Sequence, residues 1–274
     1  MTDDHRPEYS SPLRPYTQWG RATLGLGALS SLLVIAFVPL WSGFVPVAFL
    51  AGAFLVFSLT STIIYYVVDR HAAVTAPPFT SATWVTVARG AAVAGLGGFA
   101  GLAAAATGGF EFPASATVTG ADASASLRWA PAVLFAVAAL LDAVDGWLAR
   151  RTDSVTDLGA RLDLEMDGLV VLVGTTVGVL TGVLPLVFLA VAVARYVFVA
   201  SLWWRDRRGL PTAELSPSLR RRVLGALAMV AIFVALVPLV DPALSRPFAL
   251  LVAVPFLANF ARDWLVASGR LEST

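Results

Sequence analysis

Apolar runs of about twenty residues recur along almost the whole chain, separated by short polar stretches. Each run can cross a hydrocarbon core of ~30 Å as a helix that rises about 1.5 Å per residue. The pattern therefore predicts an all-α, polytopic membrane bundle of eight transmembrane helices, with both termini on the same side. We place the helices at residues 22–41, 45–68, 82–107, 129–149, 160–181, 185–204, 221–240 and 246–266.

Composition supports a membrane protein and removes several kinds of site. Of the 274 residues, 58% are hydrophobic and 14% are charged, against about a quarter charged in a soluble domain. The net charge of +1 gives no support for a nucleic-acid partner. Because the chain has no cysteine and only two histidines, disulfides and thiolate metal sites are excluded, and a histidine-based metal site is not expected.

The basic residues predict the orientation of the bundle. All 19 are arginines, and 16 of them lie on or near the side shared by the termini. Arg128 and Arg246 lie opposite, and Arg195 falls inside a predicted helix. By the positive-inside rule, we expect both termini and the loops 149–160 and 205–220 to face the cytoplasm. The expected location of the protein is the cell inner membrane.

Aspartates gather between the fourth and fifth predicted helices. Six of the 13 lie within 26 residues, at positions 142, 145, 153, 157, 163 and 167. Asp142 and Asp145 are three residues apart, and Asp163 and Asp167 are four apart, so each pair projects from one face of its helix. A connection of about ten residues makes the two helices antiparallel neighbours. Their ends therefore bring four carboxylates into one cluster.

Such a cluster requires compensation of its charge. Like charges in a site of low dielectric constant are relieved by protonation or by divalent cations. With oxygen ligands alone, the fitting ions are Mg²⁺ or Mn²⁺, with room for two that share carboxylates. Gly146, Ala149 and Gly159 keep bulky side chains away from the rim, while Arg150 and Arg151 add positive charge suited to phosphate.

These residues form a recognisable motif. The segment reads Asp142-x2-Asp145-Gly146-x2-Ala149-Arg150-x8-Gly159-x3-Asp163-x3-Asp167, and it resembles the signature of the CDP-alcohol phosphotransferase family at all eight positions. The segment from Thr83 to Arg89 is similar to the start of the family's first core helix, where the family often has Asn at the position of Thr83.

The resemblance implies a domain organisation. It covers roughly residues 80–266, which correspond to a core of six helices. We accordingly expect a cytoplasmic tail at 1–21, two additional transmembrane helices within 22–78, the family core at 79–268 and a C-terminal tail at 269–274.

The resemblance also implies roles for the motif residues. Asp142, Asp145 and Asp163 would be metal ligands, and Asp167 would contact the second metal and act as the general base. Gly146, Ala149 and Gly159 would border the cytidine diphosphate, supported by Arg150. The acceptor alcohol would attack the phosphorus farther from cytidine, with release of CMP.

Charged residues outside the motif have two interpretations each. Arg195 lies too deep for lipid exposure and is expected to face the bundle interior. It either binds the phosphate of the acceptor or lipid, helped by Arg205, Arg207 and Arg208, or forms an ion pair with a motif aspartate. Arg89 is a further candidate for contact with the acceptor or its phosphate. Glu165 points away from the face of the motif aspartates and is expected to contact loop arginines rather than metal.

The leading hypothesis is an integral-membrane enzyme of phospholipid biosynthesis that transfers a phosphatidyl group from CDP-diacylglycerol to a small polar alcohol such as glycerol 3-phosphate or inositol phosphate. Transfer of a CDP-choline or ethanolamine head group to a lipid alcohol would use the same residues. A cation transporter and a non-catalytic scaffold are the rivals from other classes. A transporter would distribute acidic residues through the depth of the bundle, and a scaffold would not need the intact motif.

Expected partners are the two substrates and membrane lipids; family similarity also implies a homodimer.

Overall fold

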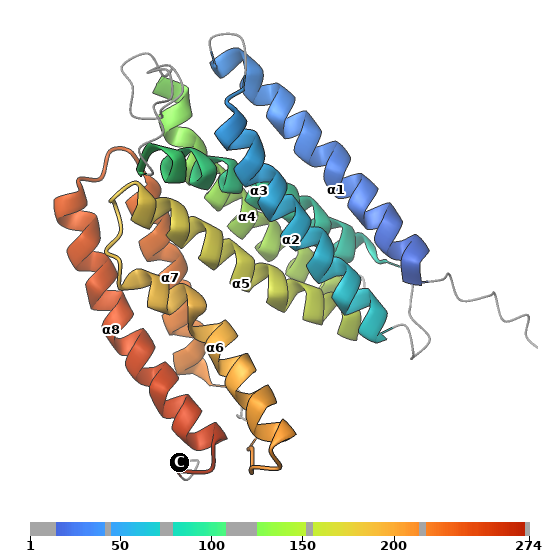
Figure 1. The fold of residues 1–274 in the computed structure, drawn as a ribbon, viewed down its shortest axis with the longest axis vertical. Helices are drawn as coiled ribbons and strands as arrows, with labels where there is room; N and C mark the ends of the chain where they lie inside the picture. Colours follow the sequence, from blue (N-terminus) through green and yellow to red (C-terminus); the bar gives the residue numbers. More distant parts are fainter. Residues whose placement is uncertain are drawn as a thin grey trace, which may run out of the picture.

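The computed structural model describes residues 15–41, 45–71, 79–107, 125–151, 156–213 and 218–271, and these contain helices and no strand. They form an all-α bundle (Figure 1), as predicted. The elements are α1 (Pro15–Phe37), the short 3-10 helix η1 (Val38–Leu40), α2 (Val47–His71), α3 (Ser81–Thr107), α4 (Ala125–Arg151), α5 (Asp157–Leu180), α6 (Phe188–Arg207), α7 (Leu219–Leu236) and α8 (Pro242–Ala267).

Six of these helices are long and apolar enough to cross a membrane: α1, α2, α3, α4, α6 and α8. The prediction was eight spans. The remaining two, α5 and α7, have charged residues in their N-terminal parts: α5 carries Asp163 and Asp167, and three consecutive arginines lie at the start of α7. Both helices continue into apolar sequence, so their charge lies at one end of the bundle.

The first helix begins earlier than the sequence pattern predicted. Residues 15–21, assigned above to the polar tail, form the first turns of α1, and residues 1–14 lie outside the described residues. Trp19 accounts for this difference, because its indole Nε1 donates a hydrogen bond to the backbone oxygen of Ser61 on α2 at 3.1 Å. Thr23 also pairs with the Ser61 hydroxyl at 2.8 Å. These contacts tie the polar start of α1 to its neighbour.

Helix α3 lies at the centre of the N-terminal half, in contact with α1, α2, α4 and α5. Its contact with α2 is made by small residues. A Cβ atom added at Gly97 would collide with Val56 Cγ2, and one added at Gly101 would collide with the carbonyl oxygen of Ala48. Gly97 and Gly101 form a G-x3-G pair of the kind that lets membrane helices approach closely. Helix α2 is therefore packed tightly against α3.

The start of α5 is fixed by a hydroxyl cap. Thr156 precedes the helix in extended conformation, and its side chain accepts a hydrogen bond from the backbone N–H of Gly159 at 3.0 Å. The C-terminal part of α4 and the N-terminal part of α5 both contact α3, through Asp142 and Asp145 of α4 and Asp163 of α5. This junction of three helices holds the motif residues.

A cavity of about 430 Å³ lies elsewhere, between α1, α3 and α4. Its lining is apolar except for Ser126 and includes none of the motif aspartates. It therefore does not mark the site described next.

Candidate metal and catalytic site

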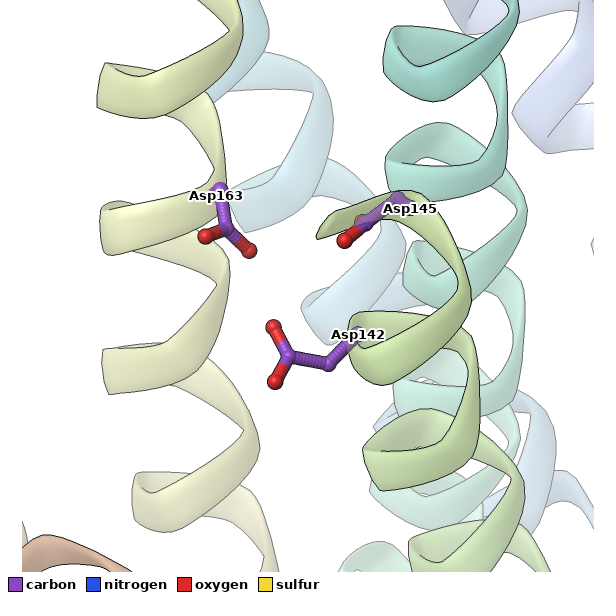
Figure 2. A group of neighbouring side chains, drawn as sticks. All are labelled: Asp142, Asp145 and Asp163. Atoms are coloured by element: carbon purple, nitrogen blue, oxygen red, sulfur yellow. The ribbon is translucent and has the colours of Figure 1, made fainter. Parts of the chain in front are cut away.

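Two helices place three carboxylates around one point. Asp142 and Asp145 come from α4 and Asp163 from α5, and one carboxylate oxygen from each lies within 4.8 Å of the others. Figure 2 shows the three side chains pointing toward the space between the two helices. The structure thus brings together three of the four aspartates that the sequence singled out.

Asp167, the fourth aspartate, is joined to this group through Arg89 of α3. Arg89 Nη1 donates hydrogen bonds to Asp142 Oδ1 at 3.0 Å and to Asp163 Oδ1 at 2.9 Å. Arg89 Nη2 donates to Asp167 Oδ1. One guanidinium therefore contacts three of the four carboxylates. We call Asp142, Asp145, Asp163 and Asp167 the carboxylate cluster.

The cluster has a closed inner side and an open outer side. Arg89 is completely buried, whereas the side chains of Asp142, Asp163 and Asp167 retain 37%, 40% and 42% exposure. The arginine therefore reaches the carboxylates from the interior of the bundle. A cation or substrate can approach from the other side.

Asp145 is the buried member of the cluster and has its own partner. It is 4% exposed, and its Oδ2 accepts a hydrogen bond from the hydroxyl of Thr86 at 2.8 Å. Thr86 and Arg89 are three residues apart and share one face of α3. The sequence pattern assigned no role to Thr86 and predicted that Arg89 contacts phosphate. Their spacing of three residues near the start of α3, which places both side chains on one face, could have indicated that they act together.

The donor set suits a hard divalent cation. Its ligand atoms are carboxylate oxygens, which match the preference of Mg²⁺ and Mn²⁺. Three carboxylates within reach of one point satisfy the first requirement of such a site, and the partial exposure of two of them leaves room for substrate oxygens.

The small residues of the motif are only partly described. Gly159 lies in the first turn of α5, where an added Cβ would come within 3.0 Å of Thr156 Oγ1 and 3.7 Å of Thr83 Oγ1. Glycine therefore lets the cap pack closely against α3. Gly146 lies on α4 and is partly buried, while the side chains of Ala149 and Arg150 lie outside the described residues. Contact of these positions with a nucleotide stays a prediction.

A second group of charged residues is centred on Glu165 of α5. Glu165 forms ion pairs with Arg161 at 3.1 Å and with Arg195 of α6 at 3.0 Å; we call these three residues the Glu165 cluster. Arg195 faces the bundle as expected, but its ion-pair partner is Glu165 rather than a motif aspartate. An added Cβ at Gly168, directly after Asp167, would lie 3.3 Å from Arg195 Cδ. The two clusters are therefore close neighbours.

Arg205 and the arginines after it have other contacts. Arg205 is buried, and its Nη2 donates hydrogen bonds to the backbone oxygens of Pro211 at 3.0 Å and Ser268 at 2.8 Å. Arg207 and Arg208 stack over Trp203 and Trp204, each 4.3 Å from the ring centroid. The described contacts of Arg205, Arg207 and Arg208 therefore do not include Arg195. Arg205 instead links the end of α6 to Ser268 at the C-terminal end of α8.

The whole arrangement can be compared with known proteins. No curated protein and no solved structure matches the chain. The model of the CDP-alcohol phosphatidyltransferase family matches residues 79–259, a range that includes α3, α4 and α5 and therefore all of the carboxylate cluster. Because this match covers most of the chain, the protein belongs to the CDP-alcohol phosphatidyltransferase family.

Proposed function

We propose that the protein transfers a phosphatidyl group from CDP-diacylglycerol to a small polar alcohol, with release of CMP, in a reaction that depends on Mg²⁺ or Mn²⁺. The family supports transfer from a CDP-linked alcohol. The observation that carries the metal requirement is the convergence of Asp142, Asp145 and Asp163 within 4.8 Å. These three residues would hold the cation, which when bound neutralises charge on the diphosphate.

The protein's own part in the reaction is proton transfer and placement. The Asp167 side chain is 42% exposed, and only its Oδ1 is engaged by Arg89, so its second oxygen is suited to accept the proton of the acceptor hydroxyl. The alcohol oxygen then forms a bond to the phosphorus farther from cytidine. The bond from that phosphorus to the oxygen of CMP breaks, and CMP leaves with the electron pair.

The Glu165 cluster supports an acceptor that carries phosphate. Arg161 and Arg195 supply two positive charges against the one negative charge of Glu165. The surplus cation lies beside the turn of α5 that holds Asp167. A phosphate on the acceptor would place its hydroxyl near the proposed base, as glycerol 3-phosphate or inositol phosphate could do.

The location of the reaction follows from the charged ends of the helices. Six long apolar helices make the protein an integral membrane protein. The carboxylate cluster lies at the end of the bundle where α4 ends and α5 begins, and the arginine-rich segments of the chain adjoin this end. By the positive-inside rule we propose that the site opens to the cytoplasm, at the inner membrane.

The test is identification of the products. Purified protein would receive CDP-diacylglycerol labelled in its lipid part, with Mn²⁺ and one acceptor at a time, and CMP and the labelled lipid would be measured together. We expect CMP to form in equal amount with a new phospholipid, and only with a phosphate-bearing acceptor. Formation of a product only from CDP-choline or CDP-ethanolamine and diacylglycerol would replace this assignment, and Asp142→Asn protein serves as the inactive control.

A further inference from the structure

The guanidinium of Arg89 occupies an unusual position for a membrane arginine. It comes from a helix that carries none of the motif aspartates, and it contacts carboxylates from both helices that do. No part of its side chain is exposed. Intramembrane arginines are costly unless they are paired inside the bundle, so these contacts account for the placement of Arg89.

The contacts are directed at the carboxylates alone. Arg89 Nε is buried and has no hydrogen-bond partner among the described residues, whereas Nη1 and Nη2 together make three charge-assisted hydrogen bonds. The planar guanidinium fork suits this bridging geometry, which an ammonium group cannot reproduce. Arg89 thus joins the C-terminal part of α4 to two successive turns of α5.

Four neighbouring carboxylates repel one another when no cation is bound. Arg89 offsets one of their negative charges from the inner side, and each carboxylate that it contacts uses one oxygen, Oδ1. The outer side of the cluster stays open, as the exposure of its side chains shows. Arg89 and a divalent cation can therefore act on the same carboxylates from opposite sides.

We propose that Arg89 is a positioning residue and a built-in counter-cation, which holds Asp142, Asp163 and Asp167 together before a metal ion binds. Its positive charge also opposes that of the incoming metal, so it stabilises the empty site and weakens metal binding. The proposal rests on the proposed function only for the statement that the carboxylates bind a divalent cation. It concerns the assembly of the site and not the identity of donor or acceptor.

Because Arg89 stabilises the metal-free site and weakens metal binding, its removal should change how strongly Mn²⁺ stabilises the protein. In Arg89→Met protein the carboxylates lose their internal cation, and the metal-free protein should unfold roughly 10 °C below wild type. Mn²⁺ should recover most of this loss, because the metal then supplies the only compensating charge. The rise in melting temperature on addition of Mn²⁺ is therefore expected to be larger in the variant, and to occur at lower Mn²⁺ concentration.

Arg205 offers a matched control. It is also a buried arginine, but it donates to backbone oxygens at the end of α6 and not to carboxylates. Arg205→Met should lower the melting temperature by the same amount with and without Mn²⁺. Arg89→Lys keeps the charge but loses the fork, so its Mn²⁺-induced rise should lie between those of wild type and Arg89→Met.

The experiment is a thermal-unfolding series on the purified full-length chain, in EDTA and over a range of Mn²⁺ concentrations, with CMP release measured on the same samples. Equal losses of melting temperature in EDTA and in Mn²⁺ for Arg89→Met would overturn the proposal, as would a Mn²⁺-induced rise no larger than that of wild type. If Arg89→Met does not fold, the same comparison is made with Arg89→Lys: a Mn²⁺-induced rise in melting temperature no larger than that of wild type would overturn the proposal. Failure of the proposed function is a separate result: wild-type protein would be stabilised by Mn²⁺ but release no CMP.

Discussion

Helix α5 carries two polar clusters of opposite balance. Asp163 and Asp167 belong to the carboxylate cluster, in which the single guanidinium of Arg89 contacts three of four acidic groups. Arg161 and Glu165 belong to the Glu165 cluster, in which two guanidinium groups face one carboxylate. Within each pair on α5 the spacing of four residues places both members on one face, and the offset of two residues between the pairs places the pairs on different faces of the helix.

The contrast would allow one helix to serve two ligands of opposite charge, a metal ion and a phosphate, as we propose. A surplus of carboxylates suits cations, and a surplus of guanidinium groups suits phosphate. In each cluster one residue of the minority charge lies between the others: Arg89 among aspartates and Glu165 between arginines. Both residues would keep their clusters compact when the ligand is absent, and both would oppose its binding.

Removal of divalent cations is expected to have the largest effect. Chelation with EDTA should abolish CMP release completely, because the diphosphate and the carboxylates would repel each other without the metal. Addition of Mg²⁺ or Mn²⁺ in excess of the chelator should restore the rate. Ca²⁺ at the same concentration is the control for charge alone, and full activity in EDTA would remove the carboxylate cluster from the chemistry.

Substitution of the proposed base comes next. Asp167→Asn keeps the size of the side chain and removes its ability to accept a proton, so kcat should fall by about 10²–10⁴-fold. Binding of the CDP-linked donor, measured with a labelled nucleotide, should remain detectable because Asp142, Asp145 and Asp163 are unchanged. A wild-type rate in this variant would exclude Asp167 as the base.

Much of this arrangement could be predicted from the chain alone. The apolar runs predicted each helix, because a span needs a continuous apolar stretch that short-range sequence displays directly. The spacing of Asp142 with Asp145 and of Asp163 with Asp167 predicted that the four carboxylates converge, since helical periodicity fixes the faces and the short connection fixes the neighbours. Three of them lie within 4.8 Å of one another, and Asp167 is joined to them through Arg89.

The contacts with residues distant in the sequence could not be predicted in the same way. Arg89 is separated from Asp142 by 53 residues and from Asp167 by 78, and the sequence does not specify the rotation of α3 that turns Arg89 inward. Likewise, the sequence placed Glu165 away from the motif face but did not identify Arg195 as its partner. Ion pairs between helices depend on packing, which periodicity alone does not determine.

Loss of Arg195 should have an intermediate effect that is specific to the acceptor. In Arg195→Ala protein the KM for a phosphate-bearing acceptor should rise by about 10–100-fold, because a charge-assisted contact is lost. The KM for the CDP-linked donor should change little. Arg161→Ala is the matched comparison: its side chain is 44% exposed, against 23% for Arg195, so its effect should be smaller. An unchanged acceptor KM in Arg195→Ala would remove this residue from the acceptor site.

The smallest effect is expected from Glu165→Gln, which makes the same change of carboxylate to amide as Asp167→Asn, half a turn away on the same helix. The amide releases Arg195 from a partly exposed ion pair, whose worth is at most ~1 kcal/mol. The acceptor KM should therefore fall by up to about fivefold, with kcat nearly unchanged. Steady-state rates over a range of acceptor concentrations measure both quantities. A fall in kcat comparable to that of Asp167→Asn would contradict the division of α5 into two clusters, because it would place Glu165 in the proton-transfer machinery with Asp167.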